Sequence, residues 1–136
     1  MILEQEIINF IEKEFWESNL NSNSDIFEET GVSGDDCDDL MTTYQKKYQV
    51  DMSEYLWYFH HEEEGSWNSF GGSFCKSPNE RVTRIPITPK MLTEFANSKK
   101  WTIDYPEHKL PKYRYDILIN WVLIISIIVI IILVKI

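Results

Sequence analysis

The stretch that decides the fold is ILINWVLIISIIVIIILV, residues 117–134. Fifteen of its eighteen residues are Ile, Leu or Val, and no charged residue interrupts it. At about 1.5 Å per residue, a helix of this length spans roughly 27 Å, close to the hydrocarbon core of a bilayer at about 30 Å. The core helix of a soluble domain would keep a polar face, and this stretch has none. We therefore expect one transmembrane helix over residues 115–136, marked along its length by Ile117, Trp121, Ile125, Val129 and Leu133.

The residues on either side of this stretch predict its orientation. Only Lys135 follows it, whereas the near flank holds a basic group made of His108, Lys109, Lys112 and Arg114. The positive-inside rule then keeps residues 1–114 in the cytoplasm, although the opposite orientation stays open. The N-terminal MILEQEIINF lacks the basic region of a signal peptide. The pattern is that of a tail-anchored, single-pass protein.

Length and charge limit what the remainder can be. About 114 residues precede the apolar stretch, enough for one small domain. Residues 1–64 hold 17 acidic side chains and 3 Lys, a net charge of −14, whereas residues 65–116 carry +4. The acidic half argues against nucleic-acid binding. The basic half could rest on anionic headgroups or be an ordinary positive-inside flank. Cys37 and Cys75 have no metal or redox spacing and are expected to be free thiols.

Apolar spacing predicts two amphipathic helices in the acidic half. The first covers residues 3–17 and would bury Leu3, Ile7, Ile8, Ile11 and Phe15, with Phe10 at one edge and Glu17 among the residues on its wet face. Residues 25–34 read as a connector. The second helix covers residues 35–48, is capped by Asp35 or Ser33, and buries Cys37, Leu40, Met41, Tyr44 and Tyr48.

The following residues give weaker patterns. Residues 50–64 read as a short helix, with an extended conformation as the alternative; residues 65–80 read as a loop and residues 82–87 as a short extended piece. Thr88 and Pro89 predict a helix start, with a buried face made of Met91, Leu92, Phe95 and Ala96. Residues 102–114 contain two prolines and form a linker. We expect the aromatic residues of the middle region to serve core and loop packing: Trp57, Tyr58, Phe59, Trp67, Phe70 and Phe74.

Neither catalysis nor metal binding has a local signature. The aspartates at positions 35, 36, 38 and 39 lack the order of a calcium loop, so we interpret them as an acidic helix start. His60 and His61 lack the HExxH spacing and are interpreted as a solvated helix end. We expect no catalytic residue, no metal and no enzyme activity. A small hydrolase or metal enzyme that uses His60, His61 or His108 is the competing hypothesis.

Three stretches resemble a known family: GVSGDDCDDLM, YQVDMSEYLWYFHHE and ITPKMLTEFANSKKW. They are similar to the bacterial domain of unknown function 1493 family, which in turn is similar to acyl carrier proteins. The resemblance implies a small acidic helical bundle. It places Gly31 on the carrier motif glycine, Asp36 on its trailing aspartate and Gly34 where the phosphopantetheine serine should be. The attachment residue is therefore missing, unless Ser33, one residue earlier, takes its place.

Together these observations predict a mainly α protein: a carrier-like helical domain (residues 1–101) with a short extended segment, a linker (102–114) and a transmembrane helix (115–136). We expect a non-enzymatic interaction module in the bacterial inner membrane, without cofactor, whose cytoplasmic domain docks a basic-patched protein through Asp35, Asp36, Asp38 and Asp39. One alternative is a genuine carrier that bears phosphopantetheine on Ser33. Another is a small membrane protein of the toxin or immunity type. We also expect Cys37, labelled in intact membranes, to report that the acidic helix faces the cytoplasm.

Overall fold

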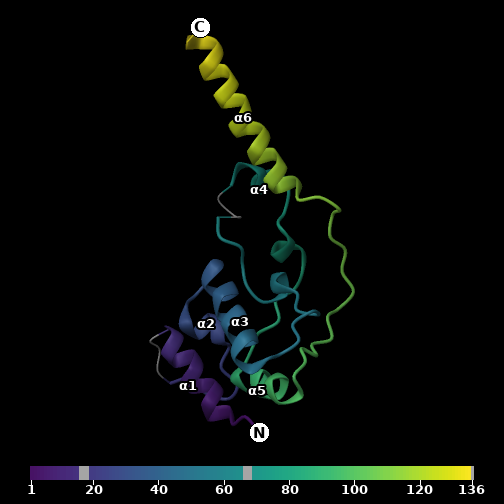
Figure 1. Cartoon of the computed structure of the whole chain (residues 1–136). Helices are drawn as coiled ribbons and strands as arrows, with labels where there is room; N and C mark the ends of the chain where they lie inside the picture. The colour runs from purple at the N-terminus through teal and green to yellow at the C-terminus, as the bar shows by residue number, and fades with distance from the viewer. Residues whose placement is uncertain (16–18, 66–68, 136) are drawn as a thin grey trace.

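The computed structural model describes residues 1–15, 19–65 and 69–135 and confirms a mainly helical protein (Figure 1). Several helices gather at one end of the molecule, and a long C-terminal helix projects from the other end (Figure 1). Within the described ranges there is no β-strand, only an isolated parallel bridge between Asp51 and Lys100. Three predictions fall outside these ranges. They are Glu17 on the polar face of the first helix, Trp67 in loop packing, and Ile136 at the end of the transmembrane helix.

The core is built on helix α1 (Glu4–Phe15), which packs against α5 (Pro89–Ser98). Ile7, Ile8 and Ile11 are buried on α1, as their spacing predicted. Leu3 is exposed instead, because it precedes the first helical residue. Trp101, just after α5, is fully buried and completes the aromatic centre of the core.

Helices α3 (Asp35–Tyr48) and α5 lie where the sequence predicted them. All five residues of the predicted α3 stripe, Cys37 to Tyr48, are buried. α5 begins with the expected cap, since the Thr88 hydroxyl accepts a hydrogen bond from the Met91 N–H at 3.2 Å. The expected cap of α3 by Asp35 or Ser33 is wrong. Gly34 occupies the N-cap with no side-chain hydrogen bond, at φ +56°.

The connector at residues 25–34 contains a helix that is too short to be predicted from the sequence. α2 (Ile26–Thr30) has five residues, and the Asp25 carboxylate caps it by accepting the Phe27 and Glu28 N–H groups. Arg84 donates two hydrogen bonds to the same carboxylate. Because Arg84 also donates to the carbonyl oxygen of His60 at 2.9 Å, it fastens α2 to the middle of the chain.

The prediction of a helix over residues 50–64 is wrong. The alternative, that the whole stretch is extended, is wrong as well. One 3₁₀ turn, η1 (Trp57–Phe59), interrupts otherwise irregular backbone. The Phe59 side chain is buried, whereas Trp57 and Tyr58 are half-buried. Contacts between aromatic rings hold this segment in place, and it does not follow the spacing of a helix.

The loop expected over residues 65–80 contains two short helical elements, α4 (Phe70–Phe74) and η2 (Pro78–Arg81). α4 packs against the start of the C-terminal helix, where Figure 1 shows the two side by side. Phe70 and Phe74 were expected to serve core and loop packing, but both are exposed. Propensity could not have predicted a helix from FGGSF, because glycine disfavours helices and five residues are too few for an isolated one.

Segments without helix or strand complete the chain. The extended piece expected at residues 82–87 forms no strand, and the Ile85 N–H there donates to the Phe59 carbonyl oxygen at 2.6 Å. Residues 102–114 form no helix and run beside the domain toward α6 (Tyr115–Lys135) (Figure 1). α6 is long and apolar enough to cross a membrane, with a mean hydropathy of 3.3. Its predicted transmembrane positions, from Ile117 to Leu133, are exposed.

Candidate docking face and the groups beneath it

The predicted docking residues lie together at the start of α3. Asp35, Asp36, Asp38 and Asp39 are all exposed, and the buried Cys37 between them keeps this end of the helix in contact with the core. Negative side chains in a first helical turn are stabilised by the helix dipole. The four carboxylates are therefore presented to solvent from a fixed backbone.

A second acidic segment adjoins them, which the sequence did not place there. The Gly34 N–H donates to the Glu62 carbonyl oxygen at 3.2 Å, so residues 61–64 cross the N-terminus of α3. Glu62 and Glu64 are exposed. We call the resulting surface the acidic face: Asp35, Asp36, Asp38, Asp39, Glu62 and Glu64. Part of it surrounds a cavity of about 220 Å³, where Asp35, Asp38 and Glu64 meet Trp57, His61 and Arg114.

His61 lies beneath this face and is buried, so its interpretation as part of a solvated helix end is wrong. Its Nδ1–H donates to the Glu62 carbonyl oxygen at 3.1 Å. Its Nε2 lies 3.2 Å from an Asp38 carboxylate oxygen, although the approach is not aligned as a hydrogen bond. The ring also packs edge-on against Phe27. His61 therefore lies beneath Asp38 without a hydrogen bond to its carboxylate.

His60 is fully buried, which again corrects the solvated interpretation. Its Nδ1 lies 2.8 Å from the Ile85 carbonyl oxygen and its Nε2 lies 2.7 Å from the Tyr105 hydroxyl oxygen. Since a carbonyl oxygen can only accept, Nδ1 carries the proton and Nε2 accepts from Tyr105. The Tyr105 oxygen in turn accepts from the Trp101 Nε1–H at 2.8 Å. Burial lowers the pKa of His60 from 6.5 to about 4, so the ring is neutral near pH 7.

Arg114 forms the ionic centre between the domain and α6. It donates to the Asp116 carboxylate at 3.0 and 2.6 Å and to the Glu63 carboxylate at 3.4 and 2.6 Å. Asp116 lies in the first turn of α6 and is buried. The two carboxylates raise the pKa of Arg114 further above its ordinary value. The sequence identified Arg114 only as positive charge, because Glu63 is 51 residues away and approaches it only in the folded chain, whereas Asp116 is two residues along.

Gly34 and Ser33 bear on the carrier alternative. A Cβ atom at position 34 would lie 2.7 Å from the Glu64 Cγ atom, and the positive φ angle strains any other residue there. A serine at position 34 would therefore disturb the local structure. Ser33 is exposed at the edge of a cavity of about 320 Å³, whose walls include His60, His61 and Arg84.

The cysteines differ in environment. Cys37 is fully buried, and burial together with nearby Asp38 and Asp36 raises the pKa of its thiol to about 12. Labelling of Cys37 in intact membranes, expected above, therefore cannot report orientation. Cys75 is half-buried.

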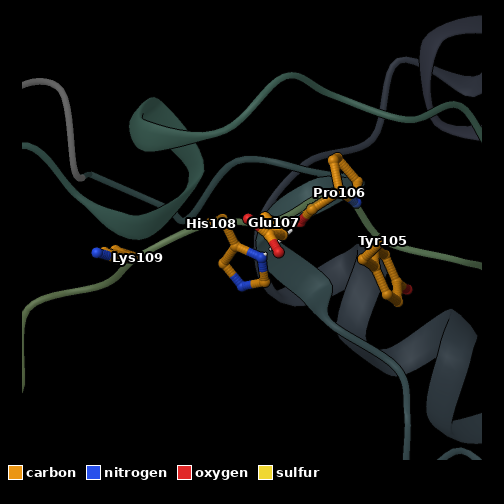
Figure 2. A pocket seen from close by; sticks show the side chains of 5 residues that line it. All are labelled: Tyr105, Pro106, Glu107, His108 and Lys109. Carbon is orange, nitrogen blue, oxygen red and sulfur yellow. Dashed lines mark hydrogen bonds between the residues drawn. The ribbon is translucent and has the colours of Figure 1, made fainter.

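One hollow on the surface is shallow and has a volume of about 730 Å³. Figure 2 shows that its lining residues, from Tyr105 to Lys109, follow one another along a single segment. His108 is held there by the Pro106 carbonyl oxygen at 2.9 Å and by the Tyr58 hydroxyl at 2.7 Å. Ligand sites gather polar groups from several elements, which this hollow does not. In the described residues no three His, Cys, Asp or Glu side chains are grouped as metal ligands.

Comparison with protein families gave a match over most of the chain. The sequence model described as "Protein of unknown function (DUF1493)" matches residues 1–104. The matched region contains the acidic face and ends just before Tyr105. Comparison with curated proteins and with solved structures gave no match.

Proposed function

The chain belongs to the DUF1493 family, and on that premise we propose that it is a non-enzymatic interaction module. In this proposal α6 anchors the domain in a bacterial cytoplasmic membrane, and the acidic face docks a cytoplasmic protein that carries a basic patch. No cofactor takes part.

The observation that carries the proposal is the convergence of two acidic segments. The start of α3 and residues 61–64 are distant in sequence, yet together they expose six carboxylates on one surface. Complementary charge steers association and selects partners, and it affects the association rate more than the affinity. A surface of this type suits a partner that must be found and released quickly.

The absence of catalysis in this proposal is supported by His60. Both of its ring nitrogens are engaged inside the core. A catalytic base needs a free nitrogen within reach of substrate, and His60 offers none.

The membrane arrangement is supported by α6 and by its basic flank. The helix carries no charge from Ile117 to Val134, and it follows the basic segment that contains Lys109, Lys112 and Arg114. Cytoplasmic flanks are enriched in Lys and Arg. The domain would then stand on the cytoplasmic side.

The proposal is tested by chemical crosslinking in membranes followed by mass spectrometry of the captured proteins. The test variant replaces Asp35, Asp36, Asp38 and Asp39 by Asn, which removes charge without reversing it. We expect it to lose crosslinks to proteins with basic surfaces, and we expect the wild-type crosslinks to weaken as salt rises. The isolated wild-type partner, added back to the reconstituted full chain, should associate more slowly with the variant.

A matched control variant has the same change in charge elsewhere on the surface. It carries Glu14→Gln, Glu29→Gln, Glu94→Gln and Asp104→Asn, all at exposed positions. The control should keep the wild-type crosslinks. Equal loss in both variants, or no loss in either, would refute docking through the acidic face.

A further inference from the structure

Helix α4 offers a second apolar surface where the domain meets α6. The Gly71 N–H donates to the Asn120 side-chain oxygen at 2.7 Å, which joins α4 to the second turn of α6. We propose that α4 is an interfacial membrane helix, with Phe70 and Phe74 inserted among lipid acyl chains beside α6. The inference rests on the proposed function in one respect, namely that α6 spans a bilayer.

The contact between the two helices is close enough to fix the depth of α4. A Cβ atom at position 71 would lie 1.8 Å from the Asp116 carbonyl oxygen. Only glycine fits there, as is common where helix backbones meet inside membranes. α4 therefore cannot be displaced along α6 without breaking this fit.

That depth coincides with the edge of the hydrocarbon region. Asn120 is three residues beyond the start of the apolar run at Ile117, or about 4.5 Å along the helix axis. Interfacial helices bury their apolar faces by about 5–10 Å at the boundary between headgroups and acyl chains. α4, hydrogen-bonded to Asn120, lies at that level.

The exposed side of α4 has the chemistry of a lipid contact. Phe70 is 52% exposed and Phe74 is 69% exposed, and their ring centroids lie 5.0 Å apart. Gly71, between them in sequence, is buried against α6. The exposed basic side chains of Lys76 and Arg81 follow α4, and cations of this kind favour the anionic headgroup layer.

Polar groups at this depth also have partners. Lipid supplies no hydrogen bonds, so backbone at membrane depth needs internal ones. The Gly72 N–H donates to the Ser69 hydroxyl at 2.8 Å, and the Cys75 N–H donates to the Gly71 carbonyl oxygen at 2.9 Å. Asn120, one of the polar residues in the apolar stretch, itself accepts the hydrogen bond from the Gly71 N–H. The contact with α4 therefore supplies a reason for an amide at this place.

The test uses the full chain reconstituted in vesicles of phosphatidylethanolamine and phosphatidylglycerol, with a fluorescent bimane on single cysteines. The parent is Cys75→Ser, and its residual signal corrects for Cys37. The variants are Phe74→Cys for α4, Ser126→Cys for the middle of α6, and Glu94→Cys for α5, at the far end of the molecule (Figure 1). Nitroxide-bearing lipids quench the label from shallow or deep positions in the acyl chain.

We expect shallow nitroxides to reduce the fluorescence at residue 74 at least about two-fold more than at residue 94, and deep nitroxides to quench residue 126. Quenching at residue 126 without quenching at residue 74 overturns the interfacial role of α4 and leaves the membrane anchor standing. No quenching at residue 126 overturns the anchor and this inference together. A Phe74 site that is shielded from both lipid and water would mean that a protein covers it, which also overturns the inference.

A second variant tests the depth-setting contact. Gly71→Ala forces α4 away from Asp116, so quenching at residue 74 should fall toward the value at residue 94. Ser73→Ala, at an exposed position of the same helix, is the control and should leave the quenching unchanged. Full quenching in the Gly71→Ala variant would show that the glycine contact does not set the depth.

Discussion

His60 joins the hydrophobic core to the segment that contains Ile85 and to the segment, from Tyr105 onward, that leads to α6. Its ring bridges the Ile85 carbonyl oxygen and the Tyr105 hydroxyl, and it stacks on Tyr55 at a centroid distance of 5.4 Å. Nothing in HHEEE distinguishes this buried ring from a solvated one, because the partners are 25 and 45 residues away. The residue types alone could not reveal the network.

The buried neutral state of His60 makes stability depend on pH. Its pKa is about 4 in the folded protein against 6.5 for a solvated histidine. Between these values the unfolded chain binds a proton that the folded chain excludes, so stability is lost as the pH falls through this range. The loss has an upper limit of about 3 kcal/mol.

Urea unfolding of the full chain in mild detergent, followed by near-ultraviolet circular dichroism from pH 7 to pH 4, measures this effect. His60→Gln keeps polar groups at the site but does not titrate, so its stability should vary less with pH in this range. Parallel pH profiles for the two proteins would contradict the assignment.

Gly34 and Gly31 differ in two ways that bear on the carrier question. Both have positive φ angles, but Gly31 is left-handed helical at ψ 17° and a Cβ atom there meets nothing within 4 Å, whereas Gly34 has ψ −128° and a Cβ atom there would meet Glu64. We expect Gly31→Ala to cost roughly 1 kcal/mol and Gly34→Ala roughly 2–3 kcal/mol of unfolding free energy. The same urea titration compares them, and equal losses would show that the Glu64 contact carries no weight.

The hydroxyl at position 33 has its own direct test. If Ser33 is not an attachment site, the intact mass of the full chain should not change on incubation with a phosphopantetheinyl transferase and coenzyme A. An added arm that disappears in Ser33→Ala would instead establish the carrier alternative.

At the scale of elements, Arg114 connects α6 to the domain through Asp116 and Glu63. Replacing Arg114 by Gln leaves the buried Asp116 without its cationic partner. We expect about ten-fold faster hydrogen exchange in α4 and the first turn of α6, since about 1.4 kcal/mol of local stability corresponds to that factor. Arg81→Gln, at an exposed position of η2, is the control for loss of positive charge.

The elements that could be predicted are those whose caps, charges and apolar spacing lie within their own residues. α3 has charges that match its dipole and a complete apolar stripe, and α5 has its Thr88–Pro89 start. α2 and α4 have five residues each and exist through Arg84 and α6, respectively. Tertiary contact, and not propensity, forms such helices. The acidic residues of α3 could likewise be identified in advance, whereas the neighbouring glutamates required knowledge of the chain path.

At the scale of the whole molecule, charge separates along the chain. The acidic residues 1–64 form most of the folded end, and the basic flank precedes α6. An anionic leaflet attracts the flank and repels the acidic domain. We therefore predict that the acidic face points toward the cytoplasm.

Thiol labelling tests this orientation with an accessible residue in place of the buried Cys37. Thr43 is exposed on α3, so Thr43→Cys in a Cys75→Ser background should react with a membrane-impermeant maleimide only after spheroplasts are lysed. Reaction in intact spheroplasts would place the domain on the outer side and contradict the positive-inside argument.

The triad of Arg114, Glu63 and Asp116 also restricts how the domain can swivel on α6. In the membrane-anchored arrangement a rigid joint holds the acidic face at a set height above the lipid. A flexible linker would instead let the domain take many orientations relative to the membrane. A partner that is itself bound to the membrane then meets the face by lateral diffusion within one thin layer. Confinement of this kind raises effective concentration without a new contact, so the joint between the domain and α6 helps to determine how often the acidic face finds a partner.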